Sequence, residues 1–323
     1  MHVVVIPSPL NLPVVTDSDR DRIVAAAGPD TRVSVVDSPD DAVPVAAEME
    51  VLLGLITPPL LEAAPRLRWV HAIASGVDQY LFPAFKQGDV ILTGEKGNVG
   101  SHLADHAFGL LLSLTRGLAK STRLHSASWD HRMEFRRDNF ELEGLTMGIV
   151  GLGGTGRAIA RRAAAFGMRC QAVDRDEVTT TPEVAEIRPM SAFPELLASS
   201  DVVAVCCPLT DETRDLFDDA AFERMKPAAI IVNVTRGGII NGDALVRALQ
   251  SGQIAAAGLD VAPREPLPPD HALWGLDNVV MTPHTAGASQ LRPARNFDRF
   301  CRNLAHLRRG EPLEGVVDKQ LGF

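Results

Sequence analysis

Three residues in the second half of the chain, Arg236, Glu265 and His284, have side chains that complement one another chemically. A guanidinium offers two parallel N–H donors to a carboxylate and a keto oxygen, a fork that lysine cannot copy. A protonated imidazole can donate a proton to a carbonyl oxygen, and a carboxylate beside it fixes which ring nitrogen faces a substrate. Each residue alone is as well explained by a surface ion pair or a turn. Only the placement of the three relative to one another can indicate a catalytic role.

The elements that would place them follow from the pattern of apolar residues. Each of the three residues comes soon after a short apolar run, at 229–232, 256–259 and 279–281, which we interpret as strands. Open parallel sheets build their ligand sites at the carboxyl ends of their strands. We therefore expect the three side chains to lie at one edge of a single parallel sheet.

A glycine-rich segment earlier in the chain has the sequence of a dinucleotide-binding turn. It fits G-x-G-x-x-G and stands between the apolar run 147–150 and a helical run that begins at Arg157. The first glycine permits a tight turn, the second lets the backbone approach a pyrophosphate, and the third lets the helix pack close to the strand. The residues that we expect to contact the cofactor here are Gly151, Gly153, Gly154, Thr155 and Gly156.

Asp174 and Arg175 indicate which dinucleotide binds. Asp174 ends the next predicted strand, where a carboxylate would accept hydrogen bonds from the adenosine ribose and repel a 2'-phosphate. Arg175 could instead accommodate that phosphate. We expect NAD, with NADP as the less favoured alternative; a glycine-rich turn followed by a solvated aspartate is the reading without a cofactor.

The same pattern predicts two α/β units, because short β-branched runs alternate with helical stretches before residue 100 and again after residue 147. A long helix is expected from Ser101, and a last helix over 291–307. The charged stretch 120–143 is a surface arm, a dimer contact or a plain surface helix. The further strands that we predict are 3–6, 33–36, 51–56, 69–73, 90–92, 170–173 and 202–206.

Composition excludes several classes of function. The 323 residues carry a formal charge of -9, which disfavours nucleic acid and anionic membranes as partners. The apolar runs are too short for a signal peptide or a membrane span. Four cysteines without CxxC spacing favour a reducing cytoplasm. His102 and His106 stand at helical i, i+4 spacing but have no third ligand in view, so we expect no metal.

These motifs together resemble the D-isomer-specific 2-hydroxyacid dehydrogenase family over residues 75–287. The resemblance is carried by the glycine turn and by the segments 207–210, 225–227, 233–238, 258–266 and 282–287. It implies that Arg236 is the catalytic arginine, Glu265 its acidic partner and His284 the acid/base. It implies that backbone at Ser75, Gly76 and Val77 holds the substrate carboxylate. The further cofactor contacts that it implies are Cys207, Pro208, Val234, Thr235, Asp260 and Gly287.

The resemblance also implies an architecture. A Rossmann-type, doubly wound nucleotide-binding domain at residues 101–287 would be inserted in a smaller flavodoxin-like α/β substrate domain, made of residues 1–100 and 288–323. Substrate would bind in the cleft between the domains, and their closure would expel water. We expect a homodimer with the stretch 120–143 at its interface.

The expected substrate is a small unphosphorylated 2-hydroxy or 2-oxo acid such as glyoxylate, hydroxypyruvate or an aliphatic 2-oxo acid. Family members that oxidise phosphoglycerate carry basic residues where this chain has Gly54, Leu55 and Ala72, and Glu265 replaces the glutamine of formate dehydrogenases. The chain departs from the family pattern at Thr235 and at residues 94–96, which lack Asn-x-Pro. An NAD(H)-sensing interaction protein like the corepressors of this fold, or a non-catalytic dinucleotide-binding subunit, is the alternative.

Overall fold

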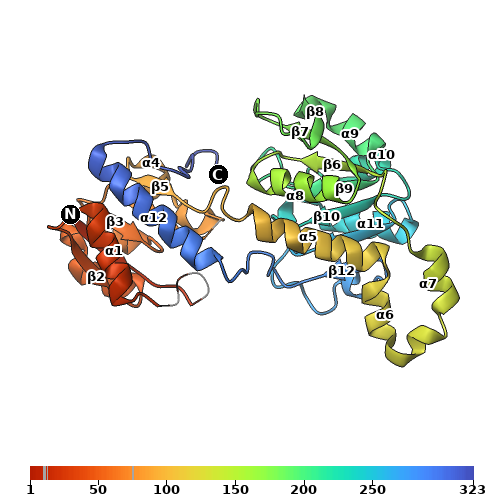
Figure 1. The fold of residues 1–323 in the computed structure, drawn as a ribbon, viewed down its shortest axis with the longest axis horizontal. Helices are drawn as coiled ribbons and strands as arrows, with labels where there is room; N and C mark the ends of the chain where they lie inside the picture. Colours follow the sequence, from red (N-terminus) through yellow and green to blue (C-terminus); the bar gives the residue numbers. More distant parts are fainter. Residues whose placement is uncertain (10–11, 13, 75) are drawn as a thin grey trace. The chain divides into compact units, whose positions relative to one another are not determined.

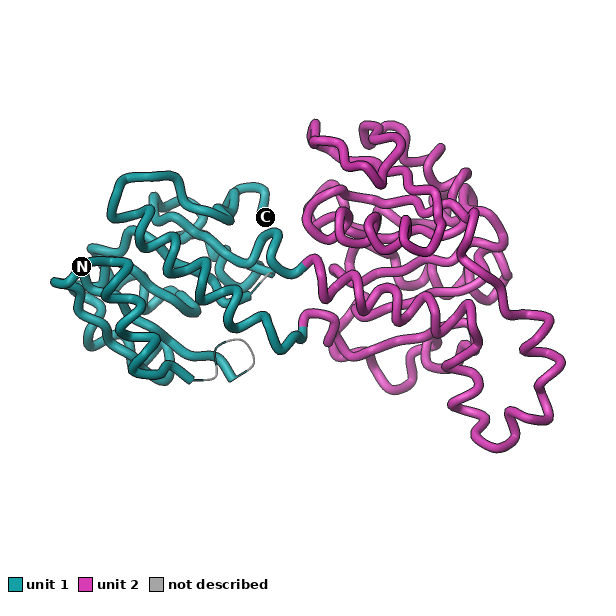
Figure 2. Tube along the Cα trace, viewed as in Figure 1, with its two compact units in different colours: residues 1–99, 288–323 teal, residues 100–287 magenta. Residues whose placement is uncertain are grey.

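A computed structural model of the chain describes residues 1–9, 12, 14–74 and 76–323. It consists of two compact units, shown in Figure 2: unit 1 contains residues 1–99 and 288–323, and unit 2 contains residues 100–287. The chain therefore leaves unit 1 once, forms all of unit 2, and returns to complete unit 1.

Unit 1 is built on a five-stranded parallel sheet in the order β2-β1-β3-β4-β5, the order of flavodoxin-like folds (Figure 1). Strands β1, β3 and β4 are fully buried, as parallel strands covered by helices on both faces must be. The strands are β1 (His2–Val5), β2 (Arg32–Val35), β3 (Val51–Leu53), β4 (Trp69–His71) and β5 (Ile91–Thr93). The helices are α1 (Asp17–Ala27), α2 (Pro39–Ala42), α3 (Pro58–Glu62), α4 (Pro83–Gln87) and the returning α12 (Arg292–Arg309).

Helix α12 is fixed to this sheet by apolar packing and by a buried histidine. Phe297, Phe300 and Leu304 recur at helical spacing and are buried against the sheet. Beneath them, the His71 ring contacts Thr93 Oγ1 through Nδ1 at 2.6 Å and Asn296 Oδ1 through Nε2 at 2.5 Å. The segment that follows the nucleotide-binding unit is therefore an integral part of unit 1.

Unit 2 is built on a seven-stranded parallel sheet in the order β12-β11-β10-β9-β6-β7-β8. The chain order reverses between β6 and β9, so this sheet is a Rossmann-type doubly wound sheet with one additional strand. The strands are β6 (Thr146–Val150), β7 (Arg169–Asp174), β8 (Val184–Pro189), β9 (Val202–Val205), β10 (Ile230–Asn233), β11 (Ala256–Leu259) and β12 (Val279–Met281). The fold class predicted from the sequence is confirmed for both sheets.

The helices of unit 2 cover both faces of its sheet. Helices α5 and α8 approach each other closely, because a Cβ atom at Gly100 would lie 2.3 Å from the carbonyl oxygen of Gly154. The α-helices of unit 2 outside the segment 118–138 are α5 (Gly100–Thr115), α8 (Gly154–Ala165), α9 (Phe193–Ser199), α10 (Asp219–Arg224) and α11 (Gly242–Ser251). Among the described residues, no helix combines the length and apolarity that a membrane span requires.

Residues 118–138 form an arm of short helices, which Figure 1 shows at the lower right of unit 2. The arm consists of α6 (Leu118–Leu124), the 3-10 turn η3 (His125–Trp129) and α7 (Arg132–Asp138). Its most exposed large apolar side chains are Trp129 at 77% and Met133 at 73%. The charged stretch 120–143 is therefore not one plain surface helix, because most of it folds as this arm, and a dimer contact there stays a prediction.

Strand β8 is the element that the sequence pattern missed. Its residues 185 and 186 are exposed because β8 lies at the edge of the sheet and pairs only with β7. An edge strand of this kind has little of the apolar run by which the other strands were predicted. The predicted strand 51–56 was too long, because β3 ends at Leu53 and Gly54 turns the chain with a φ of +145°.

Candidate active site

The residues predicted to do chemistry in unit 2 all follow parallel strands of its sheet at their carboxyl ends. The glycine turn follows β6, Asp174 ends β7, Arg236 follows β10, Asp260 and Glu265 follow β11, and His284 follows β12. Parallel pairing places these ends at one edge. The crevice expected for a dinucleotide lies at the carboxyl ends of the paired strands β6 and β9, since chain order reverses between them.

The glycine turn has the geometry that its sequence predicts. Gly151 has a φ of +95°, and a Cβ atom there would lie 2.7 Å from the backbone nitrogen of Cys207. A Cβ atom at Gly156 would lie 2.2 Å from the carbonyl oxygen of Gly151, so helix α8 packs directly against the turn. Gly153, just before α8, has no heavy atom within 4 Å of its Cβ position. This open position at a helix N-terminus fits the close approach of a pyrophosphate.

The Asp174 carboxylate lies beside this turn. Its Oδ2 accepts a hydrogen bond from the Leu152 backbone nitrogen at 2.6 Å, and its Oδ1 accepts one from the Asp176 nitrogen at 3.0 Å. The neighbouring Arg175 donates from Nε and Nη2 to the Asp176 carboxylate, at 3.1 and 3.2 Å. The acidic side chain is therefore held at the turn, while the basic one is paired with a second acid.

Two further residues predicted to contact the cofactor, Cys207 and Val234, are buried. Burial raises the pKa of the Cys207 thiol to about 12, so this side chain is an uncharged, apolar wall of the turn rather than a nucleophile. Val234 packs in the core beside β10. Cofactor contact at these positions, and at Pro208, Thr235 and Gly287, stays a prediction.

The turn that carries Arg236 is organised by a residue that sequence reasoning missed, Asn233. Its buried side chain donates from Nδ2 to the Arg236 carbonyl at 2.9 Å. Its Oδ1 accepts from the backbone nitrogen and the hydroxyl of Thr235, at 3.0 and 3.1 Å. Thr235, where the chain departs from the family pattern, thus adds a hydrogen bond to the turn. A polar residue at the end of an apolar strand was the signal for Asn233.

The Arg236 turn contacts the Glu265 loop. A Cβ atom at Gly237 would lie 1.7 Å from the carbonyl oxygen of Ala262, so the two backbones touch and only glycine fits. The backbone nitrogen of Ala262 in turn donates to Glu265 Oε1 at 3.0 Å. The loops after β10 and β11 are thereby joined next to two of the predicted catalytic side chains.

Glu265 and His284 form a hydrogen-bonded pair, with 2.6 Å between Glu265 Oε2 and His284 Nδ1. One carboxylate oxygen is therefore held by the backbone and the other by the imidazole. Because Nδ1 faces Glu265, Nε2 is the ring nitrogen that remains available to a substrate. Both side chains are accessible, 40% and 46% exposed for the acid and the base, as groups that must meet a ligand have to be.

The loop that carries His284 is held by Asp260. The Asp260 carbonyl accepts from the His284 nitrogen at 2.7 Å, and the carboxylate accepts from the nitrogens of Thr285 and Ala286, each at 2.8 Å. The side chain of Asp260 is 1% exposed. His284 itself has a φ of +55°, a left-handed conformation that few histidines adopt. Asp260 therefore positions the loop that carries His284, a role that the sequence did not indicate, and its contact with the cofactor stays a prediction.

The residues predicted to hold the substrate carboxylate belong to unit 1. Ser75 lies outside the described residues. Val77 is buried in the core of unit 1, where its side chain lies 3.7 Å from the Cβ position of Gly94. The residue after Gly94, Glu95, is buried, and its two carboxylate oxygens share the single Nε–H of Arg292, at 3.0 and 2.9 Å. This ion pair occupies the loop that lacks the family's Asn-x-Pro.

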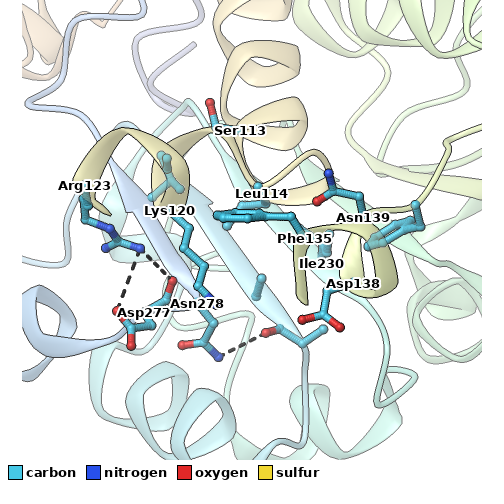
Figure 3. Close-up of a pocket in the computed structure, with 16 residues that line it drawn as sticks. Ser113, Leu114, Lys120, Arg123, Phe135, Asp138, Asn139, Ile230, Asp277 and Asn278 are labelled. Carbon is cyan, nitrogen blue, oxygen red and sulfur yellow. Dashed lines mark hydrogen bonds and ion pairs between the residues drawn. The ribbon is translucent and has the colours of Figure 1, made fainter. Parts of the chain in front are cut away.

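A pocket of about 220 Å³ lies at the opposite edge of the unit 2 sheet, between the arm and the amino ends of β10, β11 and β12. Figure 3 shows Leu114 and Phe135 lining it, with Arg123 donating to the Asp277 carbonyl at 3.1 Å. The predicted catalytic residues follow the carboxyl ends of the strands, so none of them lines this pocket.

Comparison with known proteins identifies the family of the chain. The family model of the D-isomer specific 2-hydroxyacid dehydrogenase NAD binding domain matches residues 108–286. The glyoxylate reductase of Korarchaeum cryptofilum is 36% identical over 284 residues, 85% of this chain and 84% of that protein. A crystal structure of a D-isomer specific 2-hydroxyacid dehydrogenase family protein from Aeromonas salmonicida is 31% identical, with a TM-score of 0.80 over 98% of this chain and 99% of that one.

The structure of an NADPH-dependent glyoxylate/hydroxypyruvate reductase from Sinorhizobium meliloti, in complex with NADP and sulfate, is 26% identical. Its TM-score is 0.77 over 100% of this chain and 99% of that one. The chain belongs to the D-isomer specific 2-hydroxyacid dehydrogenase family. It is a D-2-hydroxyacid dehydrogenase with a Rossmann-type NAD-binding domain, as the resemblance in its sequence predicted.

Proposed function

We propose that this enzyme reduces small unphosphorylated 2-oxo acids with NADH, and oxidises the corresponding 2-hydroxy acids in reverse. The observation that carries the proposal is the Glu265–His284 pair, anchored to the Ala262 backbone and joined through Gly237 to the loop of Arg236. A paired carboxylate and imidazole, with a guanidinium carried by the adjoining loop, is the set of groups that acid/base reduction of a keto acid requires. The Arg236 side chain itself donates from Nη1 to the Thr235 carbonyl at 2.9 Å.

In this proposal Arg236 binds the substrate carboxylate and keto oxygen and polarises the carbonyl bond. The bound nicotinamide supplies or accepts the hydride. His284 donates a proton from Nε2 to the carbonyl oxygen during reduction and removes it during oxidation. Glu265 holds the imidazole by Nδ1 and stabilises its charged form. Because one oxygen of Glu265 is bound to Ala262, the pair keeps its orientation while substrates exchange.

NAD is the proposed cofactor because of the acid at the end of β7. Asp174 is held beside the glycine turn by Leu152, where it can accept hydrogen bonds from ribose hydroxyls and repel a 2'-phosphate. Arg175, the residue that could bind that phosphate, is paired with Asp176. Gly153 leaves room for the pyrophosphate.

A second copy of the chain is the proposed partner of the arm. Trp129 and Met133 expose apolar surface on η3 and α7 that a single chain leaves in water. The pocket between the arm and the body of the unit provides further apolar surface, from Phe135 of the arm and from Leu114, Ile230 and Val280 of the body. A homodimer in which each arm lies on the other copy covers both.

A reducing compartment such as the cytoplasm is the proposed location. The four cysteines, all in described parts of the chain, are free thiols. Fractionation of cells that produce the protein, with detection of the chain in the cytosolic and other fractions, checks this assignment.

Turnover of a panel of 2-oxo acids, measured once with NADH and once with NADPH, tests the function. Glyoxylate, hydroxypyruvate, pyruvate and a phosphorylated 2-oxo acid are the arms of the panel. We expect activity with the unphosphorylated acids and a preference for NADH. His284→Ala should lower kcat by about 10²- to 10⁴-fold, and Arg236→Ala should lower kcat/KM further than Arg236→Lys.

His306→Ala, at a surface histidine of α12, is the matched control and should leave turnover unchanged. A parent protein that binds NADH but turns over none of the acids would contradict the proposal and favour the NAD(H)-sensing alternative. A preference for NADPH would contradict the cofactor assignment alone.

A further inference from the structure

Helix α5 carries a histidine that reaches the loop of the catalytic base from outside the strands. His106 Nε2 lies 2.7 Å from Thr282 Oγ1 and 3.3 Å from Asp260 Oδ1. Thr282 is the first residue of the loop that follows β12, and α5 packs against β10, β11 and β12 (Figure 1). His106 Nε2 could bind a metal ion only if these contacts with Thr282 and Asp260 were broken.

The direction of the hydrogen bonds follows from the groups themselves. The Asp260 carboxylate only accepts, so the Thr282 hydroxyl, 2.6 Å from Oδ1, must donate its single proton to it. The hydroxyl oxygen can therefore only accept from His106. His106 must then carry a proton on Nε2, whether its ring is neutral or charged. The three side chains form one directed chain, from His106 to Thr282 to Asp260.

This chain ends on the backbone that presents the catalytic base. Asp260 accepts from the nitrogens of Thr285 and Ala286 with its carboxylate, and from the nitrogen of His284 with its carbonyl. The left-handed conformation of His284 persists only where the surrounding contacts hold it. His106 and Thr282 together add the side-chain donors on the Oδ1 side of this carboxylate.

We propose that His106 is a positioning residue for the reaction: its Nε2–H orders Thr282 and Asp260, and through them the loop that aims His284. The inference deepens the proposed function and rests on it, because it assigns a task in the same site. The side-chain contacts of His106 are with Thr282 and Asp260, which hold the loop of His284, so its effect must pass through that loop.

The test compares donors at position 106. His106→Leu removes the donor, and His106→Gln replaces it with an amide N–H of similar reach. With saturating NADH, we expect His106→Leu to lower kcat by about 10- to 100-fold, the loss typical of a misplaced catalytic group. KM for the acid should stay within about twofold, because Arg236 is untouched. His106→Gln should restore kcat to within about threefold of the parent.

A double-mutant cycle separates this role from general damage to the fold. Thr282→Val removes the acceptor and should lower kcat as much as His106→Leu does, and the double variant should be no worse than either single variant, because both act through one contact. Amide exchange of residues 285 and 286 should accelerate in both. His306→Leu, which removes a histidine hydrogen bond in the other unit, is the control and should change neither readout.

Each outcome decides. Parental kcat in His106→Leu, equal losses in the Leu and Gln variants, or additive losses in the cycle would overturn the inference. A parent that turns over no acid would overturn the proposed function instead. In that case, amide exchange at 285 and 286 still decides whether His106 orders the loop, and unchanged exchange in His106→Leu overturns that too.

Discussion

At the scale of single residues, Glu265 makes two hydrogen bonds and carries a negative charge, and a neutral side chain can replace only the hydrogen bonds. One oxygen binds the Ala262 backbone and the other binds His284 Nδ1. A glutamine can keep one hydrogen bond to each, yet it carries no charge to stabilise the imidazolium from which the proton is given. Geometry and charge at this position can therefore be separated by experiment.

Glu265→Gln should lower kcat about 10- to 100-fold in the reductive direction while NADH binding stays at the parental level. Steady-state turnover and fluorescence titration with NADH measure the two quantities. Glu311→Gln, at an exposed acid of unit 1 that also contacts a histidine, is the control. A variant with full turnover would show that the charge of Glu265 is dispensable, and the acid/base assignment would have to change.

At the scale of elements, the site depends on backbone contacts between loops as much as on side chains. The Arg236 turn and the Glu265 loop meet where Gly237 faces the Ala262 carbonyl. The Asn233 side chain stabilises the first loop and the Ala262 nitrogen the second. A small displacement at this meeting point should therefore reach both catalytic side chains.

Gly237→Ala should lower both stability and turnover. Its Cβ atom would lie 1.7 Å from the Ala262 carbonyl oxygen, and overpacking of this kind costs about 1–3 kcal/mol in free energy of unfolding. We expect kcat/KM to fall at least about tenfold in the protein that remains folded. Gly275→Ala is the control, since no heavy atom lies within 4 Å of that Cβ position. Equal thermal midpoints and rates in the two variants would contradict this account of Gly237.

Helix α12 depends on a histidine that must stay neutral. Burial lowers the pKa of His71 to about 4, from 6.5. Above pH 6.5 the ring is neutral in both the folded and the unfolded chain, so it adds no pH dependence. Between pH 6.5 and about 4 the unfolded chain binds a proton that the folded chain does not. Folding should therefore lose stability as the pH falls through this window, by roughly 3 kcal/mol in all from this group.

Denaturant unfolding of the parent and of His71→Gln between pH 4 and 8 measures this effect. The variant should be less stable at pH 7, because it loses ring contacts with Trp69 and Phe300, but its stability should depend less on pH below 6.5. His131→Gln, at an exposed histidine, should keep the parental dependence. Parallel pH profiles for parent and His71→Gln would exclude His71 as the cause.

At the scale of the whole molecule, the arm is the feature that a single chain does not explain. Its Trp129 and Met133 are the most exposed large apolar side chains among the described residues. Apolar surface of this kind marks an interface or invites aggregation. The arm also borders the pocket at the amino ends of β10, β11 and β12, away from the catalytic edge.

Trp129→Glu combined with Met133→Glu should therefore shift the protein from dimer to monomer. A charged side chain at the centre of an apolar interface costs several kcal/mol when no partner neutralises it. Sedimentation or light scattering at micromolar concentration gives the mass. Leu321→Glu, at an exposed apolar residue of unit 1, is the control. A parent that is monomeric, or a double variant that stays dimeric, would remove the arm from the proposed interface.

The sequence by itself determined the α/β class and the order of motifs, and it selected Arg236, Glu265 and His284 as the predicted catalytic residues, because strand patterning and turn chemistry are local. Tertiary structure decided what depends on contacts between distant segments. Asn233, His106 and Thr282 could not be ranked from sequence, since a polar side chain shows its partner only in the fold. Strand β8 was missed for the same reason: only its neighbour β7 makes it a strand. The contact at Gly237 exists because two loops meet, and no local pattern encodes that meeting.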